Sequence, residues 1–208
     1  MPKKEAPLDA LTSFLPEGCF DQVVEYLQKY KVHLTITRDR RSILGNYRNK
    51  LYDKTHRISV NGTLNKYSFL ITLLHELAHL LAFEKNGHRI PPHGKEWKTE
   101  YSNILGEFIP RKIFPPDIEK VLFQTLASPA ASSCADTNLM RALRKYDLQK
   151  EGFAFVEDLP EESLFCIKGG RVFKKGLKVR TRYKCLEVSN GKYWLFSGVY
   201  EVKSVLSS

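Results

Sequence analysis

Two histidines and one glutamate lie within five consecutive residues of this 208-residue chain, in the segment His75-Glu76-Leu77-Ala78-His79. On a helix, residues four apart share nearly the same face, so His75 and His79 can present two imidazoles to one metal ion. Glu76 is rotated from His75 by about 100 degrees, which sets its carboxylate beside the ion rather than on it. Zinc suits neutral imidazole ligands and keeps a position open for water, from which Glu76 can accept a proton. The segment therefore predicts a zinc centre that activates water, with Glu76 as the acid/base.

A hydrolytic zinc centre needs a third protein ligand. His93 is the strongest candidate, because Gly87 can end the preceding helix and Pro91-Pro92 can direct the chain back over His79. Three other residues stay open as alternative ligands: Glu96, Glu100 and His88.

The elements that position these residues are predicted from apolar spacing. Helical periodicity or boundary signals predict helices over 8–15, 20–30, 65–86 and about 93–106, another that opens at Pro115-Pro116-Asp117 and ends near 126, and a short one near 138–147. Alternating patterns predict strands over 32–37, 42–47 and 56–61, and strands so close in sequence suggest an antiparallel meander. Four more strands are expected over 164–167, 171–173, 178–188 and 192–202, with a hairpin turn at Asn190-Gly191.

The helical segment His75-Glu76-Leu77-Ala78-His79, followed by His93-Gly94-Lys95-Glu96-Trp97, resembles the SprT-like zinc metallopeptidases, whose bacterial members are related to the eukaryotic protease Spartan. The resemblance covers about residues 8–126. It implies an α+β fold whose zincin-like core has helices, a small three-stranded antiparallel sheet and a metal-binding helix. It implies one zinc ion bound by His75, His79 and His93. It also implies Glu76 as the catalytic acid/base, a protein substrate and action near DNA.

Three segments are expected along the chain. Residues 1–126 form the metallopeptidase-like core, the small and polar residues 127–137 form a linker, and 138–208 form a basic antiparallel β subdomain. The last segment resembles a zinc ribbon in which Cys166 and Cys185 each keep one sulfur of a two-cysteine knuckle. Two thiolates cannot complete a tetrahedral site, so no second zinc is expected there. Five aromatic residues are expected to supply the packing instead: Phe173, Tyr183, Trp194, Phe196 and Tyr200.

Most of the formal net charge of +10 lies near the C-terminus, where residues 165–208 hold ten Lys/Arg and two Asp/Glu. Such a field attracts polyanions, above all nucleic acid. On one long strand, four alternating cations would share a face and could follow phosphates: Lys178, Arg180, Arg182 and Lys184. A second cluster, in a predicted loop, could extend this track: Arg38, Arg40 and Arg41.

Together with this resemblance, the composition and the motifs favour a zinc-dependent peptidase in the bacterial cytosol or nucleoid. Hydrophobic residues make up 42% of the chain, which excludes wholesale disorder, and its longest apolar run is far too short to span a bilayer. The N-terminal residues lack an apolar signal core, and four scattered cysteines suit a reducing compartment. Two rivals stay open: a nucleic-acid-binding protein with a structural or vestigial zinc site, and a zinc-dependent nuclease.

Overall fold

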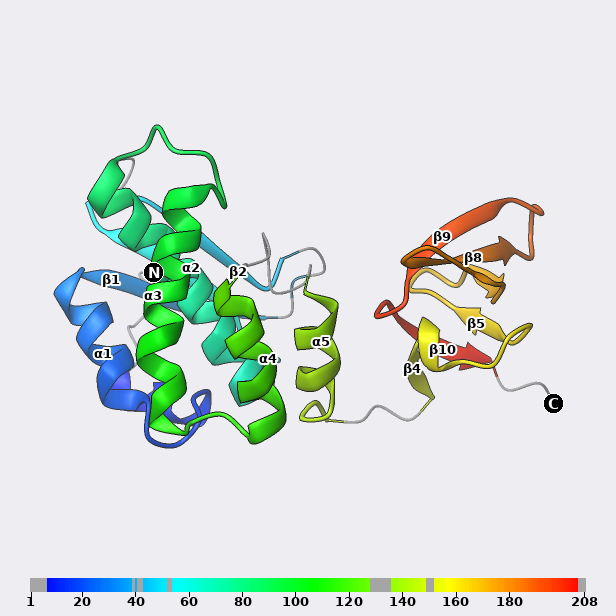
Figure 1. Cartoon of the computed structure of the whole chain (residues 1–208), viewed down its shortest axis with the longest axis horizontal. Helices are drawn as coiled ribbons and strands as arrows, with labels where there is room; N and C mark the ends of the chain where they lie inside the picture. The colour runs from blue at the N-terminus through cyan, green and yellow to red at the C-terminus, as the bar shows by residue number, and fades with distance from the viewer. Residues whose placement is uncertain are drawn as a thin grey trace, which may run out of the picture. The chain divides into compact units, whose positions relative to one another are not determined.

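The chain divides into two compact units, residues 1–147 and 148–208 (Figure 1). The computed structural model describes residues 7–38, 40, 43–51, 54–127, 136–148 and 152–205. The second unit begins at residue 148 instead of 138, because the helix expected near 138–147 packs against the preceding helix and belongs to the first unit. Most of the expected linker, 128–135, lies outside the described residues. No helix in the described ranges is both long and apolar enough to cross a membrane.

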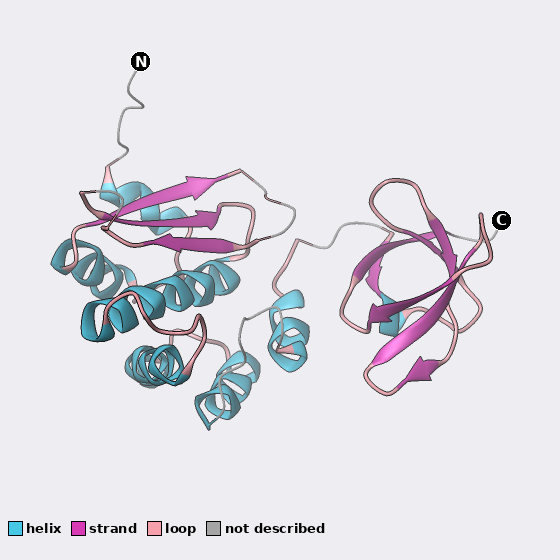
Figure 2. Ribbon diagram, turned by 90° about the horizontal axis from the view of Figure 1, so that it is seen from above, coloured by secondary structure: helices cyan, strands magenta, loops and turns pink. Residues whose placement is uncertain are grey.

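The first unit is a small sheet covered by layers of helices (Figure 2). Its elements are η1 (Leu8–Ser13), α1 (Phe20–Lys29), β1 (Val32–Thr37), β2 (Gly45–Arg48), β3 (His56–Asn61), α2 (Lys66–Asn86), α3 (Lys95–Phe108), η2 (Ile109–Arg111), α4 (Pro116–Ala127) and α5 (Thr137–Arg144). Helix α2 packs on β2 and β3, α3 packs on α2, α4 on α3, and α5 on α4. The structure thus confirms an α+β fold.

The three-stranded sheet is mixed, so the expected antiparallel meander is wrong. The strand order is β1-β3-β2, with β1 parallel to β3 and β2 antiparallel to β3. Strand β3 takes the centre because its alternate residues His56, Ile58 and Val60 are all buried, whereas β1 has no buried residue. This order leaves β2 as an edge strand beside α2.

Helix α2 begins and ends where the sequence predicts. The Asn65 side chain caps it by accepting a hydrogen bond from the Ser68 N–H at 2.9 Å. Gly87, with φ +76°, ends it. The helix is apolar around most of its circumference because it lies between the sheet and α3, which buries residues from Ser68 to Ala82 almost without a break.

The second unit is a curved antiparallel sheet (Figure 2). Its elements are β4 (Phe153–Phe155), η3 (Val156–Asp158), β5 (Leu164–Cys166), β6 (Val172–Lys174), β7 (Lys178–Val179), β8 (Arg182–Glu187), β9 (Tyr193–Ser197) and β10 (Glu201–Val205). Strand β10 returns to pair with β5 and also pairs with β4. The two long strands expected over 178–188 and 192–202 are each divided in two. The first folds into the β7–β8 hairpin at Arg180-Thr181, where Arg180 has a positive φ of 57°.

Aromatic side chains form part of the core of the second unit, beside the buried aliphatic residues Val156, Leu159 and Val202, in partial agreement with the expectation. The rings of Phe165, Phe173 and Phe196 pack against one another with centroids 4.9–5.7 Å apart. Trp194 and Tyr200 contribute less, because they stay 44% and 43% exposed. Two cysteines of this unit, Cys166 on β5 and the buried Cys185 on β8, are free thiols on strands separated by β6.

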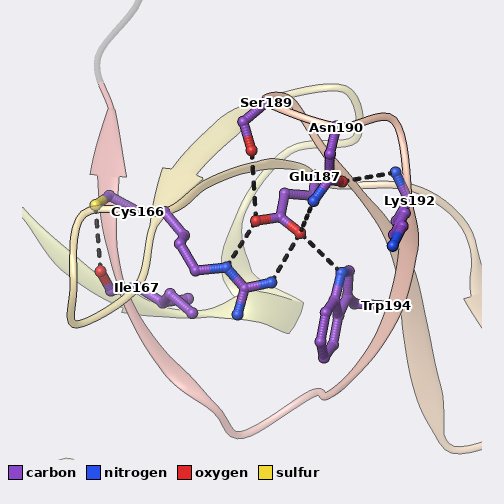
Figure 3. Close-up of polar contacts among 8 residues, drawn as sticks. Cys166, Ile167, Glu187, Ser189, Asn190, Lys192 and Trp194 are labelled. Atoms are coloured by element: carbon purple, nitrogen blue, oxygen red, sulfur yellow. Dashed lines mark hydrogen bonds and ion pairs between the residues drawn. The ribbon is translucent and has the colours of Figure 1, made fainter.

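A buried carboxylate joins the β8–β9 hairpin to the start of β6 (Figure 3). Glu187 accepts two hydrogen bonds of 2.7 Å from the Arg171 guanidinium, and one each of 3.0 Å from Asn190 and Trp194. The Arg171 guanidinium also lies over the Trp194 ring, 4.5 Å from its centroid. These contacts hold the hairpin end in one conformation.

Glu187 should make the second unit sensitive to acid. Its hydrogen bonds from Arg171 lower the pKa of Glu187 to about 2, well below the ordinary value near 4.5. The stabilisation is therefore complete above pH 4.5 and is lost as the pH falls toward 2. Glu187→Gln is expected to lower the melting temperature by several degrees at pH 7 and to flatten this acid dependence. The melting temperature at each pH is measured by tryptophan fluorescence, to which Trp97 and Trp194 alone contribute. An unchanged acid dependence would contradict the assignment.

Candidate metal centre

Three imidazoles from two segments of the first unit meet at one point. The Nε2 atoms of His75 and His79 are 3.3 Å apart, and those of His75 and His93 are 3.1 Å apart. The third pair, His79 and His93, is separated by 3.0 Å. Within the described residues, these three histidines are the one group of His, Cys, Asp and Glu side chains that could hold a metal ion.

The donor set fits a tetrahedral metal ion. Two nitrogens bound at about 2.0–2.1 Å to one tetrahedral ion lie roughly 3.3 Å apart, close to the separations seen here. Burial lowers the pKa of His75 to about 3 and that of His79 to about 4, and it also lowers the pKa of His93. All three rings are therefore neutral at pH 7 and offer nitrogen lone pairs. Behind them, the Trp97 ring packs against His75 and His93, at 4.7 Å from each.

His93 reaches the cluster from a turn, not from the helix it was expected to open. Helix α3 starts two residues later at Lys95, with Gly94 as its N-cap. His93 itself has φ +59°, a conformation that few residues other than glycine adopt. Backbone strain of this kind persists where the surroundings enforce it, and here it directs the ring toward α2.

The alternative third ligands lie outside the cluster. The Glu100 carboxylate pairs with the Lys85 ammonium at 2.8 Å. His88 is exposed in the connection between α2 and α3, and Glu96 lies in the first turn of α3. The structure therefore brings together His75, His79 and His93, as expected.

Glu76 lies beside the cluster and is pressed against β2. Its side chain is buried, with 6% of the residue exposed, and its carboxylate accepts a hydrogen bond from the Tyr47 backbone N–H. A Cβ added at Gly45 would lie 2.5 Å from Glu76 Oε1. Burial raises the pKa of Glu76 to about 8, against the opposing effects of Arg40 and of the Tyr47 N–H. A cation held by the three imidazoles would favour the ionised carboxylate.

Gly45→Ala should displace the Glu76 carboxylate. The added methyl would also lie 2.7 Å from the Thr72 side chain. Because it would be too close to both Thr72 and Glu76, one of these side chains must move. Because a shift of about 1 Å in a reacting group can lower a rate about 100-fold, any hydrolysis that depends on Glu76 should fall by that order while metal content stays unchanged. Activity and bound metal are measured on the same preparation.

Gly106→Ala is the matched control, since a Cβ there meets nothing within 4 Å. Gly106 lies inside α3, where alanine should stabilise the helix by about 0.5–1 kcal/mol. Equal activity in the two variants would contradict the close packing of Glu76 on β2.

The four cations expected to form one track do not share a face. Arg182 and Lys184 lie on the exposed face of the β8–β9 hairpin, because they alternate with Tyr183 along β8. Lys178 is paired directly with Tyr183 and so belongs to the opposite face. Arg180 lies in the β7–β8 turn. The expectation of a single straight track is therefore wrong, since it required one uninterrupted strand.

The second basic cluster is also divided. Arg40 is held within the first unit, where its guanidinium donates to Asn61 Oδ1 at 2.8 Å and to Ser59 Oγ at 2.9 Å. Arg38 is exposed, and Arg41 lies outside the described residues. Arg40 thus holds its guanidinium against the central strand β3, and the three arginines do not form one cluster in the described residues.

Sequence reasoning did not single out Gly45, Tyr47, His56 or Glu84, all of which lie at or near the site. The Tyr47 ring is parallel to that of His79, with 6.4 Å between centroids. The burial of His56 could have been predicted, because it alternates with Ile58 and Val60 along β3 and so lies on the same buried face. The positions of Gly45 and Tyr47 gave no comparable signal.

Comparison with known proteins gives a consistent family match. The profile of the SprT-like family matches residues 12–116. Two relatives named Protein SprT, from Cronobacter sakazakii and Escherichia coli K12, are each 42% identical over 57 residues, which is 26% of this chain and 34% of theirs. Protein SprT of Klebsiella pneumoniae is 59% identical over 32 residues, 15% of this chain and 19% of its own. The matched segments span about a third or less of these relatives. No solved structure matches the chain significantly.

Proposed function

Because the chain belongs to the SprT-like family and brings three imidazoles together beside a buried glutamate, we propose that it is a zinc-dependent metallopeptidase. The observation that carries the proposal is the convergence of three Nε2 atoms within 3.0–3.3 Å of one another. Neutral imidazoles in a tetrahedral arrangement with an open position favour zinc among the common divalent ions.

Zinc bound at this site would supply Lewis-acid polarisation of a peptide carbonyl and activation of a water molecule. Glu76 would accept the proton of the attacking water and deliver it to the leaving amine. Tyr47 and Gly45 of β2 would hold the Glu76 carboxylate in place for both transfers. The free thiols Cys19 and Cys185 suit the reducing cytosol that we propose as its location.

The proposal is tested on the purified full chain with labelled casein as substrate. We expect about one zinc ion per chain, cleavage that stops when a chelator removes the metal, and recovery when zinc is added back. A chain without stoichiometric zinc, or one whose cleavage survives complete metal removal, would refute the metallopeptidase.

A second candidate function, nucleic-acid binding by the second unit, is favoured by the exposed face of the β8–β9 hairpin. On this face Arg182 and Lys184 accompany two exposed apolar residues, Tyr193 at 62% and Leu195 at 55% exposure. The Lys184 ammonium lies 4.2 Å from the centre of the Tyr193 ring. Cations next to an exposed aromatic ring suit a phosphate backbone and a stacked base. We propose DNA or another nucleic acid as the partner of this face.

Reversing both charges, Arg182→Glu with Lys184→Glu, should weaken binding of single-stranded DNA. The slope of log affinity against log salt should fall by about 1.4, because each lost phosphate contact on a single strand removes roughly 0.7. Fluorescence anisotropy at several salt concentrations measures the slope. Lys178→Glu is the control from the opposite face and should change it much less. Equal losses from the two faces would count against a specific surface.

A further inference from the structure

A line of polar contacts links the edge strand β2 through β3 to the last turn of α2. The Tyr47 hydroxyl lies 2.9 Å from His56 Nδ1, and His56 Nε2 lies 3.2 Å from Glu84 Oε1. The Lys50 ammonium lies 2.8 Å from the same Glu84 oxygen. We refer to Tyr47, His56 and Glu84 as the anchoring network.

The anchoring network has one consistent direction of hydrogen donation. The hydrogen bond that Lys50 donates to Glu84 lowers the pKa of Glu84. This carboxylate is therefore ionised and can only accept hydrogen bonds. His56 must then donate from Nε2, and because burial lowers the pKa of His56, its Nδ1 is an unprotonated acceptor. The Tyr47 hydroxyl is therefore the donor to Nδ1, and it is held by a histidine that is 3% exposed.

Tyr47 contacts the proposed centre through two groups other than its hydroxyl. Its ring lies parallel to the His79 ring, with 2° between the planes. Its backbone N–H donates to the Glu76 carboxylate. A single residue thus touches both a metal-binding histidine and the acid/base, while its hydroxyl is fixed elsewhere.

Packing alone does not account for the polar atoms of this network. A phenylalanine at position 47 would fill nearly the same space against His79, and a buried imidazole is unfavourable unless it has partners. The three residues come from three elements, so their hydrogen bonds tie β2 to α2, whereas the sheet pairs β2 with β3. Outer hydrogen-bonding partners commonly orient the groups that contact a metal.

Building on the metallopeptidase proposed above, we propose that Tyr47 is a positioning residue for Glu76 and His79, and that His56 and Glu84 hold it in place. The network would act without touching the substrate. It keeps the edge of the sheet at a constant distance from the metal-binding helix.

Tyr47→Phe tests the proposal, because it removes the hydroxyl and keeps the ring. We expect it to weaken zinc binding about tenfold and to lower kcat on labelled casein about tenfold with KM unchanged, as for the loss of other outer partners. Zinc affinity is measured by chelator competition, which does not depend on hydrolysis. Glu84→Gln should change both quantities in the same direction.

The double variant Tyr47→Phe/Glu84→Gln separates a network from two local effects. If both changes break the same network, the double variant should be no worse than Tyr47→Phe alone. Tyr30→Phe is the control, because Tyr30 is a half-buried tyrosine at the C-terminal end of α1. It should leave zinc affinity unchanged. Circular dichroism verifies that each variant is folded.

Zinc affinity of Tyr47→Phe equal to that of the parent would overturn the proposal. Additive losses in the double variant would overturn it as well. A parent chain that binds zinc but leaves casein intact would instead refute the metallopeptidase, and the zinc affinities of the three variants would still decide whether Tyr47 positions His79.

Discussion

Glu76→Gln is expected to abolish casein cleavage, with a loss of about 100-fold to 10,000-fold, while the chain keeps one zinc ion. The amide is nearly the same size as the carboxylate and can still accept the Tyr47 N–H, so β2 and α2 need not move. What it loses is the ability to accept and return a proton, and positioned acid/base groups contribute rate factors of that order. Initial rates and zinc content of the same preparation measure the two effects.

Glu100→Gln is the matched control for this substitution. Glu100 is the other buried glutamate near the centre, but its carboxylate pairs with Lys85 and not with the histidines. The control should keep both zinc and activity. Undiminished cleavage by Glu76→Gln would contradict the assigned role and would favour a zinc site that is structural.

His93→Asn is expected to lower zinc affinity by more than about 100-fold and to remove activity with it. Losing an outer hydrogen-bonding partner of a zinc ligand lowers affinity roughly 10–100-fold, and losing a ligand should exceed that. Asparagine is preferable to alanine here because position 93 has φ +59°, which asparagine tolerates better than other residues with a side chain. Chelator competition on the folded variant measures the affinity.

His88→Asn controls for the loss of any histidine from the same connection between helices. His88 is exposed and lies outside the group of three, so its replacement should leave zinc affinity at the parental value. Parental zinc affinity in both His88→Asn and His93→Asn would show that His93 is not a ligand.

Helix α2 and the shared face of His75 and His79 could be predicted because the information is local. Because His75 and His79 are four residues apart, they lie on one helix face whatever surrounds the helix. The ends of α2 depend on the cap at Asn65 and on the positive φ of Gly87, which are properties of single residues. The hairpin turn at Asn190-Gly191 was predictable for the same reason, and Gly191 has φ +69°.

The strand order and the basic face could not be read from neighbouring residues. Strand β3 lies between β1 and β2 because it is the most buried, and burial depends on α2 packing over it. The β7–β8 hairpin turns at Arg180, a residue that carries no turn signal, so an apparently continuous strand placed Lys178 on the wrong face. The reversal is local, with Val179 paired to Arg182, but neither Arg180 nor Thr181 is among the residue types that dominate turns.

By itself, the sequence determined which residue types are available for zinc chemistry and that His75 and His79 share a helix face. The tertiary structure decided that His93 completes the group, because a strained turn before α3 directs its ring to α2. It also decided that Glu76 meets Gly45 and Tyr47, since an edge strand more than twenty residues away packs against the helix. Spacing along a helix follows from covalent geometry, whereas these contacts follow from the burial of apolar surface by the whole unit.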